Sequence, residues 1–163
     1  MLTDFLQLFN PLPGNHYIQI STQVDETTNA LYEMMQECDG EFRLALYTQE
    51  DVTLERSLEG TKLQLIKNFK SPFRSLPRDN DSVIFKDIFA KHAEPELLLR
   101  VAYTTLANTA DIVIIEKKNT LDIEKTKELL EKFEFRAPNH IEGVLDGYDV
   151  LTAKKMHMWG NGL

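Results

Sequence analysis

Residues 110–115 read Ala-Asp-Ile-Val-Ile-Ile, and this short segment constrains the architecture of the 163-residue chain more than any other. A strand with one face in water alternates apolar and polar residues, whereas a continuous aliphatic run suits a strand that is covered on both faces. Parallel sheets are covered in this way, because the connections between their strands usually carry helices. The segment therefore predicts an α/β protein with a mostly parallel sheet.

Helical patterns flank this strand on both sides. Pro95 suits the first turn of a helix, where its missing N–H group costs nothing. The apolar stripe that follows comprises Leu98, Val101, Ala102 and Leu106. After the strand, Asp122 is placed to cap a second helix, whose inward residues are Ile123, Thr126, Leu129, Leu130 and Phe133. This alternation favours right-handed crossovers and a three-layer αβα sandwich.

The preceding part of the chain continues the alternation. Short β-rich runs predict strands over residues 17–20, 42–47, 63–66 and 82–85. Residues 24–38 fit an amphipathic helix with Ser21 or Thr22 as its N-cap. A further, short helix is predicted to begin at Asp51 and to end before Gly60. These elements form a first β-α-β unit and its continuation.

The last part of the chain predicts a change of strand direction. Asp146-Gly147 stands between two strand-like runs, residues 140–145 and 148–156. Asp-Gly is a preferred pair for a two-residue type I′ turn, whose twist matches an antiparallel hairpin. We therefore expect a sheet that is parallel until it ends in an antiparallel β-hairpin.

The sequence predicts one α/β domain over residues 15–163, preceded by a helical appendage over residues 1–14. No repeat or Gly/Ser linker interrupts the domain. The appendage carries a short apolar pattern formed by Phe5, Leu6, Leu8 and Phe9, and it ends at Pro11, Pro13 and Gly14. Its apolar side chains are expected either to dock on the domain or to be buried in a second subunit.

Composition restricts the classes of partner. Eighteen basic and 26 acidic residues give a net charge of −8, which opposes the phosphate contacts that drive nucleic-acid binding. No apolar run is long enough to cross a bilayer. The absence of a secretory signal pattern and the single Cys38 lead us to expect a cytoplasmic protein.

One basic strip departs from the acidic composition, and it comprises Lys62, Lys67, Lys70, Arg74 and Arg78. Such a strip attracts an anionic ligand or an acidic partner surface. A solvated strand edge and loop is the simpler and preferred interpretation.

The chain resembles the Rossmann-like AdoMet-dependent methyltransferases from about Tyr17 to Met158. Residues 76–85, Leu-Pro-Arg-Asp-Asn-Asp-Ser-Val-Ile-Phe, are similar to that family's Leu-Pro loop and fourth strand. Residues 98–106 and 110–116 are similar to its fourth helix and fifth strand, and residues 132–135 with Asp146-Gly147 to its closing segment. The resemblance implies a mostly parallel Rossmann-like sheet.

The first turn of the chain departs from the family pattern. Members of the family place a Gly-x-Gly-x-Gly turn after the first strand, so that the backbone can pass close to AdoMet. The corresponding positions here are Ser21, Gln23 and Asp25, and Gln19 replaces an acidic residue that precedes them. Asp25 and Glu26 also place negative charge at the helix N-terminus, where they repel an anionic group. We therefore expect no bound cofactor.

The resemblance also supplies candidate site residues. Glu50 is nearest to the acidic residue that binds the ribose hydroxyls, Asn68 falls near the adenine-contacting position, and Ser21 lies in the cofactor turn. Asp87 and His92 follow the fourth strand and are candidates for a catalytic base or a substrate contact. A solvated carboxylate, a turn Asn, a helix-start Asp and a surface His are the alternative interpretations.

Two functional hypotheses remain open at this stage. The first is a methyltransferase-like binding or scaffolding module without AdoMet, forming a homodimer through apolar residues at both ends: Phe5, Leu8, Phe9, Met156, Met158 and Trp159. The second is an active AdoMet-dependent methyltransferase that acts on a small molecule through an atypical turn. No metal site is predicted, because His157 has no Cys or second His at ligand spacing.

Overall fold

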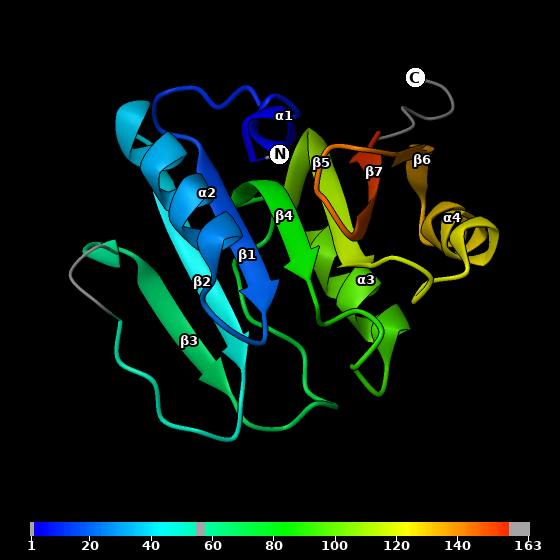
Figure 1. The fold of residues 1–163 in the computed structure, drawn as a ribbon, viewed down its shortest axis with the longest axis horizontal. Helices are drawn as coiled ribbons and strands as arrows, with labels where there is room; N and C mark the ends of the chain where they lie inside the picture. The colour runs from blue at the N-terminus through cyan, green and yellow to red at the C-terminus, as the bar shows by residue number, and fades with distance from the viewer. Residues whose placement is uncertain (1, 55–57, 157–163) are drawn as a thin grey trace.

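The computed structural model describes residues 2–54 and 58–156, and in it a seven-stranded sheet lies between two layers of helices (Figure 1). The strands are β1 (His16–Ser21), β2 (Glu41–Tyr47), β3 (Lys62–Ile66), β4 (Asn80–Lys86), β5 (Leu106–Lys117), β6 (Phe135–Ile141) and β7 (Tyr148–Lys155). The helices are α1 (Leu2–Leu6), α2 (Glu26–Glu37), α3 (Pro95–Thr105) and α4 (Ile123–Lys132).

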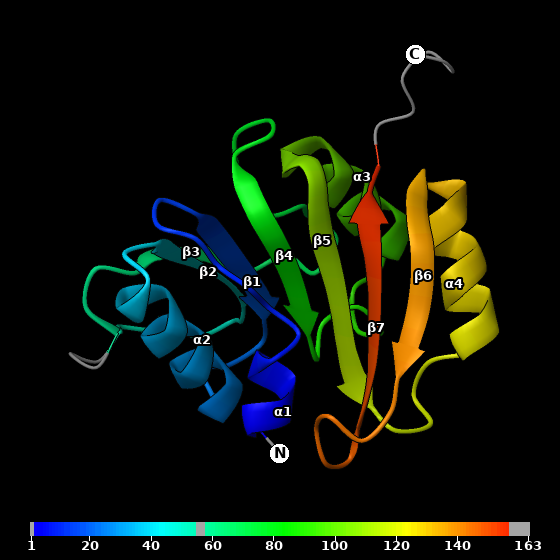
Figure 2. The same ribbon diagram turned by 90° about the horizontal axis from the view of Figure 1, so that it is seen from above.

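The strand order is β3-β2-β1-β4-β5-β7-β6. All neighbours from β3 to β5 are parallel, and β7 runs antiparallel to both β5 and β6. Helices α1 and α2 lie on one face of the sheet, and α3 and α4 lie on the other (Figure 2). The predicted αβα architecture with a parallel sheet and a final antiparallel hairpin is confirmed.

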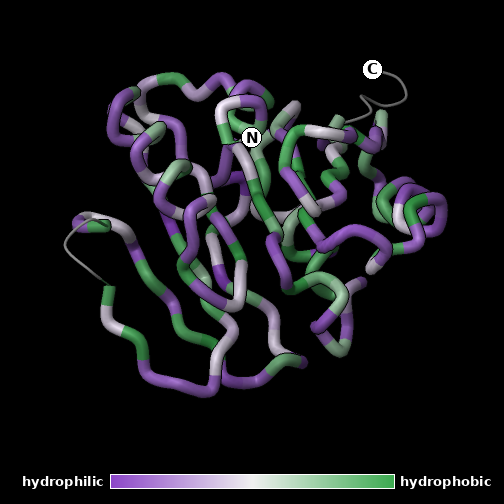
Figure 3. The backbone as a smooth tube through the Cα atoms, viewed as in Figure 1, coloured by the Kyte–Doolittle hydropathy of each residue, from purple (hydrophilic) through white to green (hydrophobic). Residues whose placement is uncertain are grey.

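Strand β5 shows why the aliphatic run was decisive. Ile112 and Ile114 are buried in the core that includes α3 and α4, whereas Val113 and Ile115 are buried in the core beneath α1 and α2. The apolar colouring of the central strands, against hydrophilic outer loops, reflects these two cores (Figure 3). Each residue of the run therefore removes apolar surface from water on one face or the other.

Helix α2 begins later than its predicted cap. Asp25, rather than Ser21 or Thr22, is the N-cap: its Oδ1 accepts a hydrogen bond from the Thr28 amide at 3.1 Å. The Asp25 amide in turn donates to Oγ1 of Thr28 at 3.2 Å. The prediction was wrong because this reciprocal capping box satisfies two backbone donors, which a lone Ser or Thr cap does not.

The predicted helix from Asp51 to Gly60 is wrong at its start, since residues 51–54 are in no helix, although Leu58 lies in a short 3₁₀ turn before Gly60. Val52 and Leu54 both pack against the core beneath α2. Two residues that are two positions apart share a face in extended chain but not in a helix. Without a helix here, both side chains reach this core and are partly buried, and Asp51 pairs at the surface with Lys67 at 3.4 Å instead of capping a helix.

The connection between β6 and β7 is longer than the predicted two-residue turn. Strand β6 ends at Ile141, which pairs with Val150, and residues 142–147 form the loop. Gly143 and Gly147 both have positive φ, 78° and 80°. A second glycine in this conformation explains why the chain opens into a loop before the Asp-Gly pair is reached.

The N-terminal segment docks on the body of the same chain. Phe5 is fully buried, and its ring centroid lies 5.2 Å from that of Phe9, which in turn contacts Tyr17. The described residues thus realise the first of the two predicted arrangements for this segment. Met156 is 41% exposed, and His157, Met158 and Trp159 lie outside the described residues.

Among residues 2–54 and 58–156, no helix has both the length and the apolar character that crossing a bilayer requires.

Candidate functional site

The carboxyl ends of β1 and β4 form the switch point of the sheet. From β1 the chain moves outward to β2 and β3, and it then returns to β4 on the other side of β1. Connections that leave neighbouring strands in opposite directions leave a crevice, and ligands of open α/β sheets bind there. Ser21 and Lys86 end these two strands and are register partners. The candidate site is therefore centred on them.

One ammonium group joins three segments at this point. Nζ of Lys86 lies 2.7 Å from Oδ2 of Asp25, 2.9 Å from Oδ2 of Asp87 and 3.3 Å from the Tyr148 hydroxyl. It also lies 4.4 Å from the centroid of the Tyr148 ring. We call these four residues the Lys86 cluster. It ties the β1–α2 turn, the end of β4 and the start of β7 together.

The Lys86 side chain is only 3% exposed, yet it stays charged. Burial by itself would lower its pKa, but hydrogen bonds to Asp25 and Asp87 and the attraction of their charges outweigh burial and raise the pKa above its ordinary value. A lysine held in this state is neither a base nor a nucleophile at neutral pH. Its role is to hold two carboxylates.

The positions occupied by glycines in the family carry side chains that are engaged here. Ser21 is fully buried, and its hydroxyl donates to the Gln23 carbonyl at 3.2 Å. Asp25 caps α2 with one carboxylate oxygen and binds Lys86 with the other. Gln19 is also fully buried, and neither polar atom of its amide has a hydrogen-bond partner in the described part of the chain. Ser21 and Asp25 thus make hydrogen bonds within the fold, whereas the Gln23 side chain is exposed.

A third carboxylate, that of Glu116, lies at this edge of the sheet and was not predicted. Glu116 near the end of β5 is 3% exposed and accepts a hydrogen bond from the Ala90 amide at 3.3 Å. Burial raises its pKa, and the nearby charge of Asp87 acts in the same direction. The only sequence signal was a charged residue directly after an aliphatic run.

The two other cofactor candidates do not join this cluster. Glu50 is exposed, and its backbone amide donates to the Thr48 hydroxyl at 3.2 Å. Asn68 is exposed as well, and its side-chain oxygen accepts from the Lys70 amide at 2.9 Å, which is a local turn contact. The contacts of both residues are those of surface loops.

The two catalytic candidates have different surroundings. Asp87 has a positive φ of 57° and belongs to the Lys86 cluster. His92 is buried: its Nδ1 accepts from the Glu94 amide at 2.9 Å, so Nε2 carries the proton and donates to the Ser71 carbonyl at 2.8 Å. The geometry of His92 thus uses both ring nitrogens within the fold.

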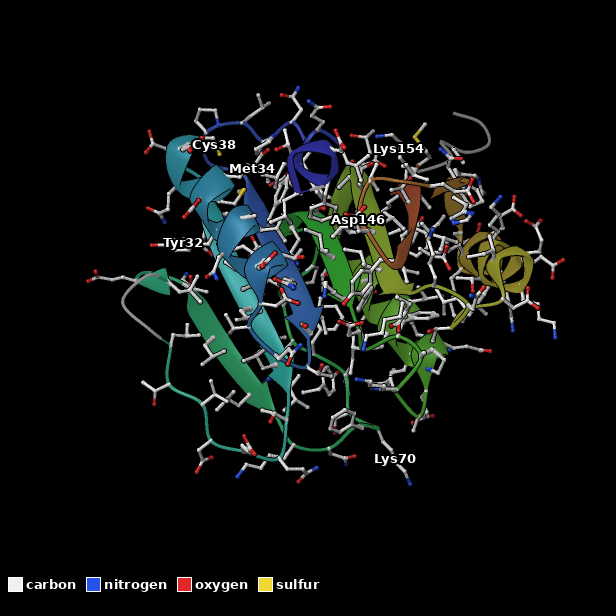
Figure 4. All side chains as sticks on the ribbon, in the orientation of Figure 1. Tyr32, Met34, Cys38, Lys70, Asp146 and Lys154 are labelled. Carbon is white, nitrogen blue, oxygen red and sulfur yellow. The ribbon has the colours of Figure 1, made fainter. Side chains whose placement is uncertain are left out.

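A cavity of about 520 Å³ adjoins the Lys86 cluster on the α1 and α2 side of the sheet. Its polar lining includes Gln23, Asp25, Glu26, Lys86, Asp146 and Tyr148. Asp146 belongs to the loop between β6 and β7 and is labelled in Figure 4. Within residues 2–54 and 58–156, no group of three or more His, Cys, Asp or Glu side chains is arranged to hold a metal ion.

The sequence matches no family model and no curated protein. Solved structures with the same fold are nevertheless numerous. An SAM-dependent methyltransferase from Aquifex aeolicus superimposes with a TM-score of 0.74 at 13% identity, over 94% of this chain and 89% of that one. Phosphoethanolamine N-methyltransferase 2 of Haemonchus contortus, solved with S-adenosyl-L-methionine, gives 0.71 at 9% identity. The [4+2]-cyclase SpnF gives 0.66 at 12% identity, over 89% of this chain and 76% of that one.

The extent of these matches differs. The chain is covered to 96% by the Haemonchus contortus enzyme but spans only 52% of it, about half its length. At such identities the likeness concerns the fold and leaves the reaction open. The strand order, the final antiparallel hairpin and these superpositions together show that the chain has the Rossmann-like fold of the class I AdoMet-dependent methyltransferases.

Proposed function

We propose that this chain is a methyltransferase-fold domain that does not bind AdoMet at the first β-α turn and that works as a binding or scaffolding module. One observation carries the proposal: the buried ammonium of Lys86 is paired with Asp25, the side chain that replaces the last glycine of the family's turn. A ligand that approached this turn closely would have to displace that pair.

The displacement has a substantial energetic cost. Removing one partner from a buried ion pair costs about 3 kcal/mol or more, because the other charge is left uncompensated. A cost of that size corresponds to roughly a hundredfold loss of affinity. Lys86 is 3% exposed and Asp25 is 20% exposed, so solvent screens the pair little. The pair therefore opposes cofactor binding more strongly than the missing glycines would alone.

The remaining cofactor candidates add little to a binding site. Glu50 and Asn68 are exposed and make only local contacts with backbone or with Thr48. Neither residue lines the cavity beside Lys86. A ribose or an adenine base would thus meet solvated side chains rather than groups already oriented for it.

A second function, that of an active small-molecule methyltransferase, is favoured by the cavity itself. Its volume of about 520 Å³ falls within the range of small-molecule sites, about 300–1,000 Å³. In that case catalysis would rest on positioning the acceptor near the methyl donor. The [4+2]-cyclase SpnF has the same fold. The fold alone therefore favours neither methyl transfer nor the absence of it.

Isothermal titration calorimetry with AdoMet and with its demethylated product distinguishes the two functions. We expect no binding at millimolar ligand, and micromolar binding would contradict the proposal. Asp25→Gly removes one of the two carboxylates that pair with Lys86, while glycine remains an acceptable N-cap. If the pair is the obstacle, this variant gains affinity and Glu26→Gln, which also lies on the cavity, does not.

A homodimer through terminal apolar residues is a separate part of the proposal. Phe5 is buried within one chain, so the dimer would depend on residues that follow β7, beginning with the partly exposed Met156. Light scattering at high protein concentration tests it. A monomer under those conditions would rule the dimer out, whereas loss of association in Met156→Glu would support it.

A further inference from the structure

A basic pocket lies at the opposite, amino edge of the sheet. It has a volume of about 260 Å³, and its charged lining consists of Arg43, Lys62, Arg74 and Asp79. Leu63 and Leu76 form its apolar walls. The pocket is remote from the Lys86 cluster, because Arg43 and Lys62 belong to the first residues of β2 and β3, whereas Lys86 ends β4.

The structure divides the basic strip of the sequence into two cations that line this pocket and three that do not, Lys67, Lys70 and Arg78. Lys62 and Arg74 meet at this pocket, whereas Lys67 follows the carboxyl end of β3 and pairs with Asp51. Lys70 extends from a loop at the periphery of the molecule (Figure 4). Of the strip, only Lys62 and Arg74 therefore contribute to a concave, positively charged surface.

Neighbouring groups hold the Arg43 side chain and the Arg74 backbone in place. The Arg43 guanidinium is 14% exposed, binds Asp79 at 2.7 Å and also pairs with Glu41. The backbone of Arg74 is fixed by Gln64, whose amide accepts from its N–H at 2.8 Å and donates to its carbonyl at 2.7 Å. The Arg43 guanidinium and the Arg74 backbone are thus preorganised, which reduces part of the entropic cost of binding.

The charges of the pocket do not cancel. Arg43 is balanced by Asp79, and Lys62 pairs with Glu41 at 3.3 Å. Arg74 is exposed and has no ion pair within the described residues. One positive charge therefore remains, on the rim of a pocket in a chain whose net charge is −8. A local charge of this sign attracts an acidic group.

Volume and apolar surface restrict the occupant further. About 260 Å³ is below the usual range of sites for whole small molecules, about 300–1,000 Å³, and suits one or two side chains. Leu76 is 69% exposed, the highest value among the exposed large apolar residues described, and it lies beside Arg74 on the rim. An acidic side chain next to an apolar one would match both the positive charge of Arg74 and the apolar surface of Leu76.

We propose that this pocket docks an acidic peptide segment of a protein partner, with a carboxylate on Arg74 and Lys62 and an adjacent apolar side chain against Leu76. The proposal goes beyond the loss of AdoMet binding and holds whether or not that cofactor binds at the other edge. It assigns a contact surface to the proposed binding module and names the residue types of its partner, which are acidic and apolar.

The test is an NMR titration of the full chain, labelled with ¹⁵N, with an acetylated peptide of alternating Glu and Leu. We expect the backbone amides of residues 62–64 and 74–76 to shift, with a dissociation constant on the order of 0.1 mM. A peptide with Lys in place of Glu should not bind. Arg74→Glu should weaken binding at least about tenfold, and Leu76→Ala should weaken it several-fold.

The matched control is Lys91→Glu, the same charge change on an exposed residue that follows β4 at the other edge of the sheet. It should leave the affinity unchanged. An equal loss in Lys91→Glu, equal binding of the Lys peptide, or shifts confined to other residues would overturn the proposal. Inorganic phosphate that produces the same shifts at the same concentration would reduce the pocket to a simple anion site and would overturn it too.

Discussion

The Lys86 ammonium lies 2.7 Å from Oδ2 of Asp25, so the end of β4 is joined by an ion pair to the residue that caps α2. Lys86→Met should lower the free energy of unfolding by about 3 kcal/mol, because Asp25 and Asp87 lose the cation they share. Urea denaturation at pH 7 measures the change. Lys91→Met, at an exposed position, is the control, and a loss as small as that of the control would contradict a structural role for the pair.

Gln19 places an amide in an apolar core without a partner among the described residues. Gln19→Met keeps a similar shape and removes the polar atoms, so we expect it to raise the free energy of unfolding by about 1–2 kcal/mol. Gln23→Met, at an exposed position of the turn that follows β1, should have little effect. A loss of stability in Gln19→Met would mean that an ordered water satisfies the amide.

His92 contacts the Ser71 carbonyl and the Glu94 amide through its two ring nitrogens. His92→Phe should cost about 2 kcal/mol, mainly because the Glu94 amide loses its acceptor. Tyr47→Phe is the matched variant, since it removes only the second hydrogen bond to the same Ser71 carbonyl, and it should cost about 1 kcal/mol. Unchanged thermal unfolding in His92→Phe would contradict this structural role of the ring.

Arg43 makes stability depend on pH. Burial alone would raise the pKa values of Glu41 and Asp79, but hydrogen bonds and the charge of Arg43 lower both below their ordinary values of 4.5 and 3.8. A lowered folded pKa stabilises the fold above the ordinary value, and this stabilisation is lost as pH falls through the folded pKa.

We therefore expect the free energy of unfolding to decrease as pH falls below about 4.5, and Arg43→Met to flatten that decrease. Urea denaturation over a series of pH values measures it. Arg136→Met removes a more exposed pair with Glu134 and should leave the slope unchanged. An identical slope in wild type and Arg43→Met would exclude Arg43, Glu41 and Asp79 as the source of the pH dependence.

Phe5 fixes the N-terminal helix to the body of the chain. Because its ring is fully buried against Phe9 and the core beneath α2, Phe5→Ala should cost about 3–5 kcal/mol in unfolding free energy. Leu12→Ala, at a position 59% exposed, should cost little. A small effect of Phe5→Ala in thermal or urea unfolding would argue that α1 is not integral to the core.

The sheet could be predicted from sequence because each strand and each helix start is marked by residues that are neighbours in the sequence. The run from Ile112 to Ile115 specifies a strand covered on both faces, and Pro95 and Asp122 mark helix starts that the structure retains. Local patterns failed where two local solutions competed. Asp25 displaced Ser21 as a cap because Thr28, three residues later, completes a reciprocal pair of hydrogen bonds.

The candidate site could be predicted only in part. The departures at Ser21 and Asp25 located the first turn. Lys86, which pairs with Asp25, follows it by 61 residues in the sequence, and Tyr148 follows Lys86 by 62 residues. No periodicity connects such residues, because the sheet order alone brings them together. Contacts between distant segments are thus the part of a site that composition and spacing leave undetermined.

The order β5-β7-β6 also has a consequence during synthesis. Among the described strands β6 pairs only with β7, and β7 fills the position between β5 and β6. A growing polypeptide releases residues 135–141 from the ribosome before residues 148–155, so β6 emerges without any strand to receive it. Until the final strand inserts, the nascent chain exposes an open apolar edge on β5, the kind of surface that chaperones cover.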